Sequence, residues 1–144
     1  MKAIADSGFI AAIFARSAPR QQKWALDLMR QVELPVPTTI LNIFEAGALT
    51  SNPEGIMRLV IEGDFKLALD FAQEQEALHA LLKKYPERMD LPDAAIVRLS
   101  ELFPRHTVLT VDRTDFSIYR RFKTEKIPCE FPPDGKAEKG KRDF

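Results

Sequence analysis

The 144-residue sequence contains a single cysteine, Cys129, so no disulfide can form within the chain and a reducing compartment is expected. It also contains no apolar run near the roughly 20 residues that a membrane-spanning helix requires. These two absences predict a cytoplasmic protein with no membrane partner.

The chain lacks an excess of charge of either sign, because its 21 basic side chains balance 21 acidic ones. Proteins that bind nucleic acids often carry net positive charge, so this balance counts against that class unless acids gathered in one pocket offset a basic rim. The sequence has no glycine-rich phosphate loop, which argues against the P-loop and dinucleotide-binding folds. Its two histidines, His79 and His106, are isolated, and solvated or capping roles suit them better than metal binding.

What the sequence does contain is a regular alternation of strand-like and helix-like segments. Apolar segments predict strands at residues 2–6, 36–40, 65–69 and 107–112. Apolar residues at helical spacing predict helices at residues 9–16, 21–32, 41–49, 55–61, 73–84 and 90–103. This order predicts an α/β fold with a mostly parallel central sheet flanked by helices.

The last part of the chain predicts the end of the domain. Residues 116–121 are expected to form a short helix or turn, and residues 122–127 a final edge strand. From residue 128 to 144, prolines, a glycine and lysines dominate, which is typical of chain with little order. We therefore expect one domain over residues 1–127 and a mobile tail over residues 128–144.

Two of the predicted strands end on an aspartate, Asp6 and Asp112. In parallel α/β sheets, ligands bind outside the carboxyl ends of the strands, so these side chains are candidates for chemistry. The alternative is that each aspartate only starts a turn by accepting a backbone hydrogen bond.

Acids also fall on the apolar faces of two predicted helices. Glu45 lies four residues from both Leu41 and Leu49, and an acid within an apolar stripe is costly unless it is paired or binds a metal. Its alternative role is a buried salt bridge to an arginine. Asp93 extends the apolar face of its own helix, whereas capping is the favoured role for Asp90 at the start of that helix.

If Asp6, Glu45, Asp93 and Asp112 converge, they form a site for a divalent cation. Carboxylates that lie so close together repel one another, and a bound cation removes the energetic cost of that repulsion. All-oxygen ligands favour Mg²⁺ or Mn²⁺ over zinc, and such a site suits the hydrolysis of phosphodiester bonds. Arg16, Arg113 and Arg120 are candidates for binding the substrate backbone, with solvated surface charge as their alternative role.

The order and setting of the acids resemble the PIN-domain family, particularly the VapC-type ribonuclease toxins of toxin–antitoxin pairs. The matching segments, within residues 1–122, are Ala5-Asp6-Ser7-Gly8, Thr38-Thr39 before Glu45-Ala46, Met89-Asp90-Leu91-Pro92-Asp93-Ala94-Ala95, Leu109-Thr110-Val111-Asp112-Arg113 and Asp115-Phe116-Ser117-Ile118-Tyr119-Arg120. Each motif is short, and it is their shared order and spacing that are specific.

The resemblance implies a PIN-like three-layer fold and an endoribonuclease whose Mg²⁺ or Mn²⁺ is held by Asp6, Glu45, Asp93 and Asp112. It further implies that the hydroxyls of Ser7 and Thr110 support these ligands. Asp90 would either contact the ligands without touching the metal or cap its helix. An RNA substrate, a homodimer and a cognate antitoxin protein are implied in the same way.

Other functions have weaker support in the sequence. Phosphatases of the haloacid-dehalogenase type need a second aspartate two residues after the first, where this chain has Gly8. A housekeeping RNA-processing nuclease would share the same site without an antitoxin. A non-catalytic PIN-like module that binds RNA or protein is the rival from another class, and the presence of all four acids argues against it.

Overall fold

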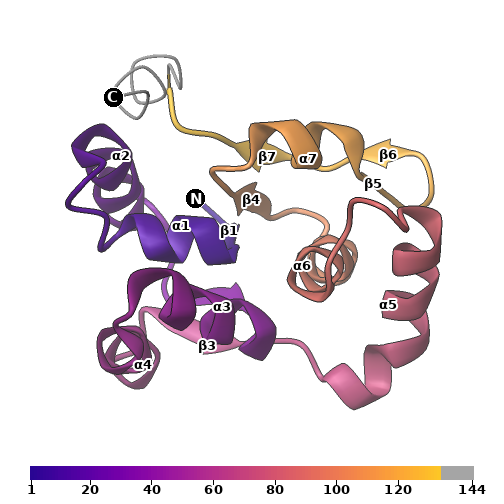
Figure 1. The fold of residues 1–144 in the computed structure, drawn as a ribbon, viewed down its shortest axis with the longest axis horizontal. Helices are drawn as coiled ribbons and strands as arrows, with labels where there is room; N and C mark the ends of the chain where they lie inside the picture. The colour runs from indigo at the N-terminus through magenta and orange to yellow at the C-terminus, as the bar shows by residue number, and fades with distance from the viewer. Residues whose placement is uncertain (134–144) are drawn as a thin grey trace.

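The computed structural model describes residues 1–133, which form a mixed α/β fold around a small parallel sheet (Figure 1). Residues 134–144, most of the predicted tail, lie outside the described residues. The helices of the described part are α1 (Ser7–Ala12), α2 (Pro19–Met29), α3 (Ile40–Thr50), α4 (Pro53–Ile61), α5 (Phe71–Lys84), α6 (Leu91–Leu102) and α7 (Arg113–Ile118). Its strands are β1 (Ala3–Ala5), β2 (Val36–Thr38), β3 (Phe65–Leu67), β4 (Thr107–Leu109), β5 (Arg120–Arg121), β6 (Glu125–Lys126) and β7 (Cys129–Glu130).

Parallel pairing connects the strands of the central sheet. β4 lies between β1 and β7 and runs parallel to both, while β2 and β3 form a second parallel pair. The two groups meet where β2 lies beside β1, and there the Thr38 hydroxyl donates a hydrogen bond to the Ala5 carbonyl at 2.7 Å. The carboxyl ends of β1 and β4 consequently reach the same edge, because their register places Ala5 opposite Leu109.

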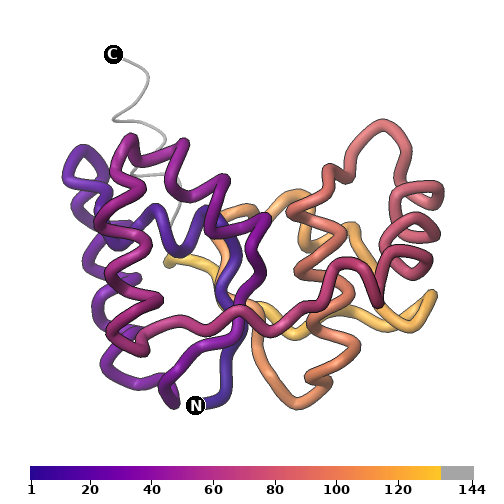
Figure 2. The backbone as a smooth tube through the Cα atoms, turned by 90° about the horizontal axis from the view of Figure 1, so that it is seen from below, coloured from indigo at the N-terminus to yellow at the C-terminus, as the bar shows by residue number. Residues whose placement is uncertain are grey.

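Helices cover the sheet on both faces, giving three layers. Successive strand side chains point to opposite faces, so Ala3 and Ala5 enter the core beneath α1–α4, and Ile4 enters a second core beneath α5–α7. On β4, Leu109 enters the first of these cores and Val108 enters the second. Figure 2 shows the indigo-to-magenta helices on one side of the strands and the later helices on the other.

The end of the domain differs from the prediction. β7 pairs with β4 in the central sheet, so the ordered fold continues past residue 127, where we expected the tail to begin. The segment expected to be one edge strand is instead the second half of an antiparallel hairpin, β5–β6, which turns through left-handed residues at Phe122 and Lys123. The prediction used the composition of residues 128–144, yet the Pro128 carbonyl accepts the Val108 N–H at 2.8 Å and so joins the segment to β4.

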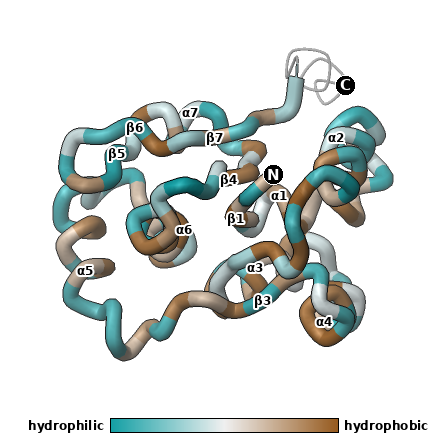
Figure 3. The backbone as a smooth tube through the Cα atoms, turned by 180° about the vertical axis from the view of Figure 1, so that it is seen from behind, coloured by the Kyte–Doolittle hydropathy of each residue, from teal (hydrophilic) through white to brown (hydrophobic). Residues whose placement is uncertain are grey.

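Hydropathy follows the layers. In Figure 3 the apolar segments of β1, β4 and α6 gather in the interior, while much of α2 and α5 is polar. None of the helices in residues 1–133 has the length and apolar character needed to span a bilayer.

Candidate active site

All four predicted acids line one pocket of about 280 Å³ at the carboxyl edge of the sheet. They come from four separate segments: Asp6 follows β1, Glu45 lies on α3, Asp93 on α6, and Asp112 follows β4. The pocket is completed by Ser7, Gly8, Asn42, Leu49, Arg88, Asp90, Val111 and Asp115. The fold therefore brings together residues that lie more than a hundred positions apart in the sequence.

Asp6 is the most deeply buried of the four acids, with 7% of its surface exposed. It caps α1 by accepting the Phe9 backbone N–H at 2.8 Å, as an aspartate at a strand end commonly does. Burial raises the pKa of Asp6 to about 7, although hydrogen bonds from the Thr110 side chain and the Phe9 N–H lower it. The charges of Asp112 and Glu45 raise it further.

Thr110 links the two strand-end aspartates. Its side chain hydrogen-bonds the Asp6 carboxylate, and its hydroxyl oxygen accepts the Asp112 backbone N–H at 3.0 Å. Asp112 in turn caps α7 by accepting the Asp115 N–H at 2.9 Å. Partial burial raises the pKa of Asp112 above its ordinary value. Turn-starting and pocket-lining roles therefore coexist in both aspartates.

Asp93 is held by a tyrosine that sequence reasoning did not single out. The Tyr119 hydroxyl donates to the Asp93 carboxylate at 2.8 Å. Burial raises the pKa of Asp93 strongly, and the charge of Asp90 adds to the effect. The predicted capping role of Asp90 is confirmed, since its carboxylate accepts the Asp93 N–H at 2.9 Å.

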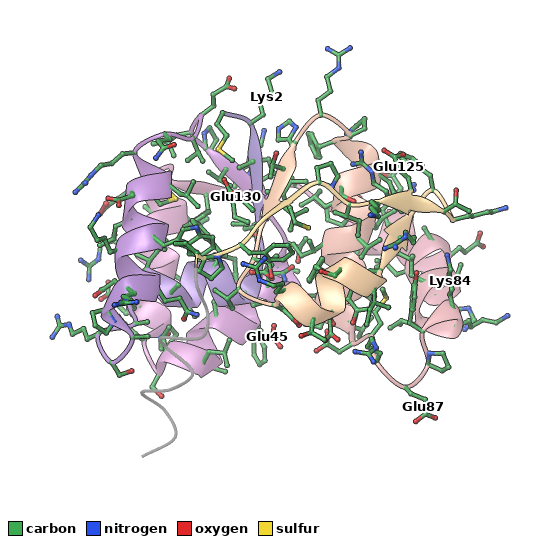
Figure 4. All side chains as sticks on the ribbon, turned by 90° about the horizontal axis from the view of Figure 1, so that it is seen from above. Lys2, Glu45, Lys84, Glu87, Glu125 and Glu130 are labelled. Carbon is green, nitrogen blue, oxygen red and sulfur yellow. The ribbon has the colours of Figure 1, made fainter. Side chains whose placement is uncertain are left out.

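Glu45 does not lie within a buried stripe, and that part of the prediction is wrong. The buried face of α3 consists of Asn42, Ile43, Ala46 and Gly47, and Leu49 is 62% exposed. Glu45 is half-buried at the edge of this face, and in Figure 4 its side chain lies at the lower rim of the fold, between the purple and the orange helices. The salt bridge weighed as its alternative role is not found either, since none of the ion pairs within residues 1–133 includes Glu45.

Asn42 is a site residue that the sequence analysis missed. It is almost fully buried, and its amide donates to the Ser7 hydroxyl oxygen at 2.9 Å and more weakly to the Pro92 carbonyl at 3.4 Å. Its amide oxygen accepts the Thr39 hydroxyl. Asn42 thus ties together the starts of α1, α3 and α6, which carry or adjoin three of the four acids. The sequence feature that could have indicated this role is the position of the amide, three residues before Glu45 and on the same helix face as apolar residues.

Gly8 allows two segments of the site to approach closely. A Cβ atom at this position would lie 2.6 Å from the Cγ2 atom of Val111, which is too close for any larger residue without movement. The first turn of α1 can therefore pack directly against the segment that carries Asp112.

The three predicted substrate-binding arginines do not line the pocket. Arg113 donates to the Pro132 carbonyl at 2.9 Å and lies over the Phe131 ring, while Arg120 caps α7 by donating to its last carbonyls. Arg16 is exposed after α1. The arginine at the pocket is Arg88, which pairs with Asp115 at 2.6 Å.

Within residues 1–133, no three carboxylate, imidazole or thiol side chains already stand close enough to share one cation. The local contacts give a physical reason, because Asp6, Asp93 and Asp112 each direct an oxygen to a neighbouring donor and repel one another.

No protein-family model matches the chain, and a search of the curated proteins finds no match.

Proposed function

We propose that this protein is a metal-dependent endoribonuclease with a PIN-like fold, and that Asp6, Glu45, Asp93 and Asp112 hold its Mg²⁺ or Mn²⁺. The observation that carries the proposal is the convergence of these four acids, from four separate segments, on one pocket. The three-layer arrangement around a parallel sheet is compatible with a PIN-like fold. The choice of RNA as substrate follows the sequence resemblance.

The donor set of the pocket suits a hard divalent cation. Its acids offer only oxygen ligands, which Mg²⁺ and Mn²⁺ prefer. The pKa values of Asp6, Asp93 and Asp112 are all raised, which means that the pocket disfavours their ionised forms without a counter-charge. A bound metal would supply that charge, activate a water for attack and neutralise charge that grows on the phosphate.

The chain's own residues would orient these ligands. Tyr119 holds Asp93, Thr110 holds Asp6, and Asn42 fixes Ser7 relative to the start of α6. Each of these three contacts joins separate segments of the chain, so the pocket is assembled by the tertiary fold and is lost when the fold is lost.

Cleavage and thermal stability measured on the same preparations test this proposal. The purified protein should cleave single-stranded RNA in Mn²⁺, lose that activity in EDTA, and gain thermal stability when Mn²⁺ is added. Asp6→Asn and Asp112→Asn should abolish both effects while retaining their helix caps, since asparagine caps as well as aspartate.

Asp70→Asn is the matched control, because Asp70 caps α5 in the same way but does not line the pocket. It should leave both effects intact. A wild-type protein that neither gains stability with Mn²⁺ nor cleaves RNA would refute the nuclease, and RNA binding without cleavage would favour the non-catalytic module.

For the cellular role, we propose the toxin of a toxin–antitoxin pair, with a housekeeping RNA-processing nuclease as the alternative. Both rest on the resemblance, and both use the same pocket. Co-purification of the chain with a small protein encoded beside it, and release of RNA cleavage on removing that protein, would support the toxin. Cells that tolerate strong expression of the chain alone would argue for the housekeeping nuclease.

We also propose that the chain forms a homodimer through the outer face of α3 and α4. This face has an apolar groove of about 440 Å³, lined by residues that include Gly47, Ala48 and Pro53. Phe44 also lines this groove and is 78% exposed, and α4 is visibly apolar in Figure 3. An exposed apolar face of this kind can pack against the same face of a second copy across a twofold axis. Phe44→Asp should convert a dimer to a monomer in light scattering, and a monomeric wild-type protein would refute the proposal.

A further inference from the structure

Arg88 is the one cationic side chain among the residues that line the acidic pocket in the described part of the chain. Six carboxylates share that lining: Asp6, Glu45, Asp90, Asp93, Asp112 and Asp115. A fixed positive charge in this position reduces the attraction of the pocket for a divalent cation. Its presence is useful to a ligand that is itself negatively charged.

The backbone of Arg88 is held firmly between α5 and α6. Its N–H donates to the Tyr85 carbonyl at 3.2 Å, and its carbonyl accepts the Tyr119 hydroxyl at 3.3 Å. The single proton of that hydroxyl is shared with the nearer Asp93 carboxylate oxygen, which lies at 2.8 Å. The origin of the arginine side chain is therefore fixed relative to one of the proposed metal ligands.

Among residues 1–133, the guanidinium of Arg88 has one ion-pair partner, Asp115, and it keeps further donors. Its Nη1 atom lies 2.6 Å from Asp115 Oδ1, and the side chain is 44% exposed. An exposed pair of this kind contributes little to stability, so holding the fold together does not account for the position of Arg88. The planar guanidinium has five N–H donors and matches the oxygens of a phosphate.

We propose that Arg88 is a substrate-binding residue that donates to a backbone phosphate of RNA at the acidic pocket, and that Asp115 occupies the guanidinium until the substrate arrives. The inference rests on the proposed nuclease function. The arginine reduces the repulsion between the phosphate and the surrounding carboxylates, and the proposed metal would reduce it further. A phosphate that replaces Asp115 as its partner would lie beside Asp93 and Asp112.

This role makes metal binding and RNA binding respond in opposite directions to one substitution. Arg88→Gln should raise the KM for a fluorescent single-stranded RNA by about ten- to a hundredfold, the loss expected for hydrogen bonds between charged groups, with a much smaller change in kcat. In the same variant, Mn²⁺ alone should raise the melting temperature at a lower concentration than in the wild type. Arg88→Lys should restore the charge and recover KM only in part, because an ammonium lacks the paired donors.

Two further variants separate this role from a structural one. Asp115→Asn releases the guanidinium from its competitor and should lower KM. Arg58→Gln breaks the comparable Arg58–Glu54 pair on α4, away from the pocket, and should leave KM and the Mn²⁺ response unchanged. Equal increases in KM for Arg88→Gln and Asp115→Asn, or an unchanged KM in Arg88→Gln, would overturn the proposal for Arg88 alone. Absence of RNA cleavage by the wild type would overturn the nuclease together with it.

Discussion

The buried carboxylate of Asp6 predicts a definite pH dependence of stability in the absence of metal. Its pKa rises from an ordinary 3.8 to about 7 in the folded protein, chiefly through burial. The folded state therefore binds more protons than the unfolded state between these two values. Stability must fall as the pH rises through this window, and it must level off above about pH 7.

The size of this effect follows from the same pKa values. Each unit by which the pKa rises lowers the free energy of unfolding of the ionised form by about 1.4 kcal/mol. The shift from 3.8 to about 7 therefore costs the folded protein on the order of 4 kcal/mol above pH 7. Asp6→Asn removes the titrating group and keeps the cap on α1. The variant should match the wild type near pH 4 and exceed its free energy of unfolding by about that amount at pH 8.

Urea unfolding in EDTA, measured on both proteins from pH 4 to pH 8, tests this reasoning. Asp93 and Asp112 also have raised pKa values and add to the slope of both curves, so the difference between the two proteins reports Asp6 together with its charge interaction with Asp112. Adding Mn²⁺ at pH 8 should restore the wild type and leave Asp6→Asn unaffected, because the metal replaces the missing counter-charge. Parallel curves for the two proteins across this range would refute the argument that Asp6 is buried without a counter-charge.

Three further substitutions test the contacts that assemble the pocket. Tyr119→Phe removes a hydrogen bond that lowers the pKa of Asp93, so Mn²⁺ binding followed by thermal shift should weaken by about tenfold or more. Asn42→Ala leaves buried polar partners unsatisfied and should destabilise the protein by about 1–3 kcal/mol in urea unfolding, with a further loss of Mn²⁺ affinity that a general packing defect would not produce. Gly8→Ala places a methyl group 2.6 Å from Val111 Cγ2 and should cost about 1–3 kcal/mol, and an unchanged urea midpoint would show that the segments separate freely.

The sequence predicted the alternation of strands and helices well, because hydrophobic periodicity and terminal signals are local. Asp90 illustrates this, since it begins α6 and caps it as expected. The end of the domain failed because strand pairing is not local. β7 has only two residues and follows a proline, so its place in the sheet depends on the open edge of β4.

The candidate site was predicted best where its residues follow from topology. Strands that run parallel deliver Asp6 and Asp112 to one edge, so their convergence could be expected from the sequence pattern alone. Arg88 and Tyr119 could not be found in that way. Each enters the site through a long-range contact, Arg88 with Asp115 and Tyr119 with Asp93, and each stands in an ordinary setting in the sequence.

Glu45 shows how a correct placement can follow from incorrect reasoning. We expected it to be costly because it lay between two leucines, but Leu49 is largely exposed and Glu45 itself is half-buried beside the pocket. The buried polar residue of α3 is Asn42, one turn earlier, which satisfies its amide by joining three helix starts. On α3 the buried polar side chain is the neutral amide of Asn42, whose hydrogen bonds offset the cost of its burial and position the site. The Glu45 carboxylate lies at the accessible edge of the helix, where it keeps the side-chain freedom that its proposed role as a metal ligand requires.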